Sequence, residues 1–90
     1  MPALTRRQIH PIAQIILDDP GHRPELLLDP LRYQTGRARS ITVSAGATIR
    51  PPLDNRLATV AAWLDWHCLH IASAELVSPR RYRIVVGMLQ

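Results

Sequence analysis

The sequence predicts a small α+β domain, in which a two- to three-stranded sheet packs on one long helix at about residues 54–74. Apolar residues recur at helical spacing across 57–71, and apolar and polar residues alternate across 40–49. Strand-forming residues fill 81–89. Short helical segments in the proline-rich N-terminal part complete the predicted fold.

Prolines divide residues 1–39 and exclude a long uninterrupted helix there. Isoleucines at helical spacing within 12–16 predict a short helix, which ends at the Asp-Asp-Pro-Gly turn signal of 18–21. A proline is expected to open a second helical turn over 24–28. We expect these segments to cover an end or the other side of the sheet.

Residues 40–90 are predicted to form a strand–helix–strand core within one domain that spans 1–90. The alternation over 40–49 is typical of a half-buried strand, which two prolines then end. In the second strand, alternate residues from Tyr82 to Met88 share one face, and a turn is expected at 78–80. A parallel arrangement of the two strands would require a right-handed crossover.

The long helix is apolar on two sides, and Asp54 is expected to cap its N-terminus. One stripe is assigned to the core: Leu57, Val60, Ala61, Leu64, Cys68 and Ile71. The second side forms the candidate protein-binding surface: Thr59, Trp63, Trp66, Leu69 and His70. Either the N-terminal segments cover this side as ordinary core, or it contacts a protein partner or a second copy in a homodimer.

Composition places the chain among soluble, cytoplasmic proteins. Its 90 residues are 47% apolar, which is typical of one folded domain. A single cysteine forms no internal disulfide, which fits a reducing compartment. The N-terminus lacks the apolar region of a secretory signal, and the apolar runs are too short to cross a membrane.

Arginine supplies all eleven basic residues of this chain, whose net charge is +4. The absence of lysine and phenylalanine fits the codon usage of a GC-rich genome. Two groups form a candidate nucleic-acid-binding surface: Arg37 and Arg39, then Arg80, Arg81, Tyr82 and Arg83. If their strands are neighbours, the arginines would contact phosphates and Tyr82 would stack on an unpaired base. A solvated strand edge and an acidic protein partner are the alternatives.

Within this group, residues 78–81 resemble the Ser-Pro-basic-basic element of minor-groove-binding tails. The resemblance covers four residues and occurs once in the chain. It implies an affinity for nucleic acid.

No catalytic or metal-binding motif is predicted. His67, Cys68 and His70 come closest, but Cys68 belongs to the core stripe and His70 to the other side of the helix. They are therefore expected neither to share a zinc ion nor to form a nucleophile–base pair. The four glycines are scattered, so there is no phosphate-binding loop. We expect no enzymatic activity, no cofactor and no metal.

The sequence thus predicts a small protein-binding adaptor or inhibitor of the phage or plasmid type, which docks on a macromolecular complex through the Trp-bearing side of its helix. The alternative is a nucleic-acid-binding regulatory module that uses the arginine groups.

Overall fold

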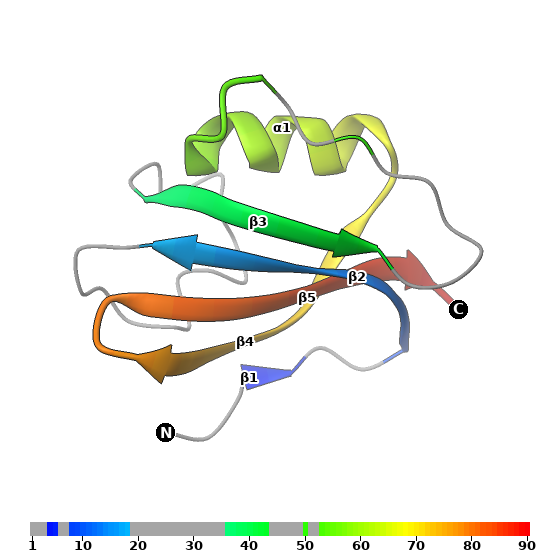
Figure 1. Ribbon diagram of the computed structural model, residues 1–90. Helices are drawn as coiled ribbons and strands as arrows, with labels where there is room; N and C mark the ends of the chain where they lie inside the picture. Colours follow the sequence, from blue (N-terminus) through cyan, green and yellow to red (C-terminus); the bar gives the residue numbers. More distant parts are fainter. Residues whose placement is uncertain (1–3, 6–7, 19–35, 44–49, 51–52) are drawn as a thin grey trace.

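The computed structural model describes residues 4–5, 8–18, 36–43, 50 and 53–90. These residues form one antiparallel sheet and one helix (Figure 1). The elements are β1 (Leu4–Thr5), β2 (Ile9–Asp18), β3 (Arg37–Val43), α1 (Leu57–Trp66), β4 (His70–Ser78) and β5 (Arg81–Leu89).

The predicted fold is wrong in the number of its strands and in the length of its helix. The sheet has five strands in the order β1-β4-β5-β2-β3, and the helix has only 10 residues. All four pairings between neighbouring strands are antiparallel; β3 and β5, the two predicted strands, run in the same direction, but β2 lies between them. The chain is a sheet with one short helix, and not a sheet packed on one long helix.

β2 takes the place of the predicted N-terminal helix. Ala13, Ile15 and Leu17 are buried, and Ile12 and Ile16, on the alternate positions, are half-buried. The strand pairs with β5 on one side and with β3 on the other, so it lies inside the sheet. An interior strand with apolar residues on both faces shows no clear period of two. The spacing of its isoleucines therefore also fits one face of a helix.

The helix ends at Trp66 because Cys68 adopts a left-handed conformation, with φ 57°. The N–H of Leu69 donates to the carbonyl oxygen of Leu64 at 2.8 Å, and the N–H of Cys68 donates to that of Asp65 at 3.0 Å. These two bonds define a Schellman motif, the common C-terminal cap of helices. The chain then enters β4, where the long helix had been predicted to continue.

The predicted core stripe divides at this cap. Leu57, Val60, Ala61 and Leu64 are buried on α1, as expected. Ile71 is also buried, but it lies on β4, and Cys68 is exposed.

The N-terminus of α1 is fixed to β3 and is not capped by Asp54. Arg56 is the N-cap residue, and the Asp54 carboxylate accepts its N–H at 3.0 Å. The side-chain amide of Asn55 donates to the carbonyl oxygen of Ala38 at 2.7 Å. The backbone N–H of Ala38 donates in return to the backbone carbonyl oxygen of Asn55 at 2.8 Å. These bonds occupy the outer edge of β3 where the strand begins.

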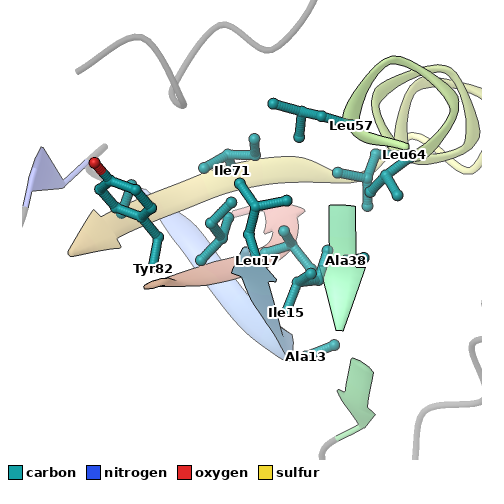
Figure 2. Close-up of a cluster of buried hydrophobic side chains, with 12 residues drawn as sticks. Ala13, Ile15, Leu17, Ala38, Leu57, Leu64, Ile71 and Tyr82 are labelled. Atoms are coloured by element: carbon teal, nitrogen blue, oxygen red, sulfur yellow. The ribbon is translucent and has the colours of Figure 1, made fainter. Parts of the chain in front are cut away.

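The core lies on the sheet face that α1 covers (Figure 2). Leu17 lies between Ala38 of β3 and Tyr82 of β5 in the sheet register. In the next row, Ile15 lies between Ile41 and Ile84. Leu57, Val60 and Leu64 of α1 belong to the same buried cluster.

The predicted strand over 81–89 is confirmed as β5. The predicted strand over 40–49 is described only to Val43, and it begins earlier, at Arg37. The turn at 78–80 joins β4 to β5, with Arg80 at φ 65°. The predicted helical turn over 24–28 lies outside the described residues.

Gly87 of β5 is buried where β2 bends towards it. The register of the two strands shifts between Pro11 and Ala13, which leaves Ile12 as an extra residue. A Cβ atom at position 87 would overlap the carbonyl group of His10. The close approach of two backbones therefore requires glycine here.

Gly87→Ala should lower the free energy of unfolding by about 3 kcal/mol, because the added methyl group meets backbone atoms. Chemical denaturation followed by circular dichroism measures the change. Met88→Ala, a change at the exposed neighbouring residue, should cost no more than about 0.5 kcal/mol. Equal stability of Gly87→Ala and the wild type would contradict the close approach.

Cys68→Gly should raise the free energy of unfolding by about 1 kcal/mol, since glycine adopts the left-handed C-cap conformation without a Cβ clash. Cys68→Ala is the matched control, because it removes the thiol and retains the Cβ atom. The same denaturation experiment under reducing conditions compares the two variants. A similar gain from alanine would show that the thiol, and not the backbone, is responsible.

Candidate binding surfaces

The five residues of the predicted protein-binding surface do not share one helix face. Thr59, Trp63 and Trp66 lie on α1, but Leu69 follows the helix and His70 is the first residue of β4. The helical spacing that connected these five residues in the sequence stops at Trp66.

The two tryptophans have different surroundings. Trp63 is half-buried and packs against the core cluster, as Leu69 does. Its ring also makes an edge contact with His67, with ring centroids 5.2 Å apart. Trp66 is 83% exposed. Trp63 thus contributes to the core, and Trp66 remains a surface residue.

Trp66 lies at one end of the sheet with two other exposed apolar side chains. Met88 and Leu89 are 50% and 63% exposed at the end of β5. His70, which follows the helix cap, pairs with Gly87, so the C-terminus of α1 reaches the same end (Figure 1). We call Trp66, Met88 and Leu89 the apolar end.

The backbone of the apolar end is held in the sheet. Met88 and Leu89 pair with His10 and Ile9 of β2. The N–H of Gln90 donates to the carbonyl oxygen of Gln8 at 2.8 Å. The sequence predicted Met88 only as the last residue on one face of a strand. It did not predict that Met88 lies at the same end as Trp66, because no local pattern gives the position of α1 relative to β5.

The arginine groups meet at the opposite end of the sheet. Arg37 on β3 and Arg81 on β5 both pair with Asp18, the last residue of β2. Arg80 lies in the adjoining turn. The two groups therefore share one sheet end, although their strands are not neighbours and β2 lies between them.

Asp18 joins the two groups by ion pairs. Its Oδ1 accepts the Nε–H of Arg81 at 2.9 Å, and its Oδ2 accepts an Nη1–H of Arg39 at 3.1 Å. We call Asp18, Arg37, Arg39, Arg80 and Arg81 the basic end. Sequence reasoning missed Asp18 because it treated the residue as part of a solvated turn after a helix.

Two members of the predicted nucleic-acid surface have other surroundings. Arg83 forms an ion pair with Glu75 of β4. Tyr82 is only 2% exposed and lies on the core face (Figure 2). Its ring therefore does not face solvent at the basic end.

Hydrogen bonding controls the titration of Asp18. The bond from Arg81 is the main cause that holds the pKa of this carboxyl below its ordinary value of 3.8; desolvation opposes it, and the bond from Arg39 adds to it. The pKa of Asp54 is lowered in the same way by its hydrogen bond from Arg56.

The described residues contain no group of three or more histidine, cysteine or acidic side chains placed to hold a metal ion. In the same part of the chain, no helix is long and apolar enough to span a membrane. No protein-family model, curated protein or solved structure matches this chain.

Asp18→Asn should remove a pH-dependent contribution to stability. Because the folded-state pKa is lowered, the carboxylate contributes stability above pH 3.8 and loses it as the pH falls through the folded-state pKa. The wild type should therefore be more stable than Asp18→Asn at pH 7, and the two should converge as the pH falls through the lowered folded-state pKa. Urea unfolding across this range measures the difference.

A double variant tests the cause of that pH dependence. Arg39→Gln with Arg81→Gln removes both partners of Asp18. In this background, Asp18→Asn should change the pH profile little. An undiminished effect would show that the ion pairs do not control the carboxyl.

Proposed function

We propose that this chain is a non-enzymatic, cytoplasmic protein-binding module, an adaptor or inhibitor that docks on a macromolecular complex through its apolar end. The observation that carries the proposal is Trp66, which is 83% exposed at the C-terminus of α1. Tryptophan is enriched at the hot spots of protein interfaces, where its large ring fills a pocket of the partner. An indole this exposed on a free chain offers much apolar area for burial on binding.

The surroundings of Trp66 support an apolar contact. Met88 and Leu89 add exposed apolar area at the same end of the sheet, one on each of its two faces. Asp65 is the only charged side chain on α1. A partner with an apolar pocket and a hydrogen-bond acceptor for the indole N–H would fit this end.

The backbone that carries these side chains is ordered before binding. The Schellman motif fixes α1 next to Trp66, and the ladder with β2 holds Met88 and Leu89. Anchors on regular elements lose little backbone entropy when a complex forms, which favours affinity.

Trp66→Ala should weaken the complex by at least about thirtyfold, the loss typical of a hot-spot residue. The partner is isolated from host extract with the wild-type chain and purified, and its Kd for each variant is then measured by calorimetry. The thermal unfolding of Trp66→Ala should match that of the wild type, because the side chain is exposed.

Two variants control this experiment. Leu53 is also fully exposed but precedes α1, at the end where Asn55 bonds to β3, so Leu53→Ala should change the Kd less than about twofold. Trp63→Ala should instead destabilise the fold by about 3 kcal/mol, because the ring packs on the core. Equal loss of affinity in the Leu53 and Trp66 variants would contradict the proposal, as would unfolding of Trp66→Ala. Light scattering shows whether the partner is a second copy of the chain.

A further inference from the structure

The basic end carries an excess of positive charge on three neighbouring segments. Arg37, Arg39, Arg80 and Arg81 lie at this end with Asp18, the one acidic residue of the described chain there, and Arg39 and Arg81 contact its carboxylate. Arg37 and Arg80 are exposed and make no ion pair within the described part of the chain. The charge of this end therefore has the same sign as the net charge of +4 on the whole chain.

We infer that the basic end is a second binding site, which takes the phosphate backbone of double-helical nucleic acid. Arginine is suited to this ligand, because its planar guanidinium binds phosphate oxygens through two parallel hydrogen bonds. A row of arginines contributed by β3, β5 and the turn before β5 matches a ligand that carries charge at every nucleotide.

Asp18 is a positioning residue in this site. It engages one N–H of Arg39 and one of Arg81, at 3.1 and 2.9 Å. Each guanidinium has about five N–H donors, so most of them remain available to a ligand. Two otherwise flexible side chains are thereby held in place before a phosphate binds, which lowers the entropic cost of binding.

The position of Tyr82 favours a duplex over a single strand. Proteins that bind single strands stack bases on exposed aromatic rings. Tyr82 is 2% exposed on the core face, and no other Phe, Tyr or Trp side chain lies on the described parts of β2, β3 and β5. Contacts to phosphates carry no sequence information, so a site that binds the backbone alone is expected to bind independently of sequence.

The spacing of the strands fits a groove. β3 and β5 lie on opposite sides of β2, so their arginines start about 10 Å apart, two strand spacings. This separation lies between the widths of the minor and major grooves of DNA, about 6 and 12 Å. The side chains of Arg37 and Arg80, which no ion pair holds at Asp18, can therefore reach phosphates on both sides of a groove.

Fluorescence anisotropy with a labelled random-sequence DNA duplex tests the site. The logarithm of the affinity should fall linearly with the logarithm of the salt concentration, with a slope of about −3 for three to four phosphate contacts. Arg37→Gln combined with Arg80→Gln should reduce that slope by about 2 and weaken binding at least about tenfold in low salt. Trp66→Ala should bind the duplex as the wild type does, since it changes the other end of the sheet.

Asp18→Asn separates positioning from net charge. The variant gains one unit of positive charge, so simple attraction to a polyanion would tighten binding. If Asp18 holds Arg39 and Arg81 in place, binding should weaken instead, in a variant that circular dichroism shows to be folded. Tighter binding would overturn the positioning role.

Arg50→Gln is the matched charge control. Arg50 is exposed and outside the basic end, so its loss should change the affinity less than about twofold. An equal effect of Arg50→Gln and the Arg37/Arg80 pair would overturn the site, and so would the absence of binding. Polyglutamate that competes as well as the duplex would assign the site to acidic protein. A single strand that binds as tightly as the duplex would overturn the groove geometry.

Discussion

The pairing of β2 with both β5 and β3 is the interaction on which the rest of the structure depends. It buries Ile15 and Leu17 from both sides of the strand. It creates the face that α1 covers, and it requires the close approach at Gly87. It also places Asp18 between two arginine-bearing strands, so the basic end is a direct product of the core pairing.

Local patterns predicted the C-terminal strand and the buried face of the helix, but not the number of strands. The stripe from Leu57 to Leu64 and the strand 81–89 carry clear periods, and both are present. β2 was missed because an interior strand is apolar on both faces, and its isoleucines fit either period. The predicted helix was too long because apolar residues continue past Cys68. Only the left-handed backbone conformation of Cys68 marks the end of the helix.

The sequence predicted which residue types form the candidate sites, but it predicted less well which of these residues lie together. The arginine segments do meet, but the carboxylate that joins them belongs to a strand that was not foreseen. The different surroundings of Trp63 and Trp66 depend on where α1 packs on the sheet, and the pairing of β4 with β5 places Met88 at the same end of the sheet as the C-terminus of α1. Contacts between residues distant in the chain are set by tertiary packing, which no local period encodes.

The β2–β5 ladder also has a consequence for synthesis on the ribosome. Asp18 and Arg81, its nearest pair along the chain, are 63 residues apart. β2 therefore leaves the exit tunnel long before β5, so the edge of β2 that β5 occupies stays unpaired in the meantime, with apolar side chains in contact with water or a chaperone. The hairpin of β4 and β5 forms locally, and the arrival of β5 permits β2 to enter the sheet. Completion of the fold is thus expected to be a late, cooperative event with slow, topology-limited kinetics.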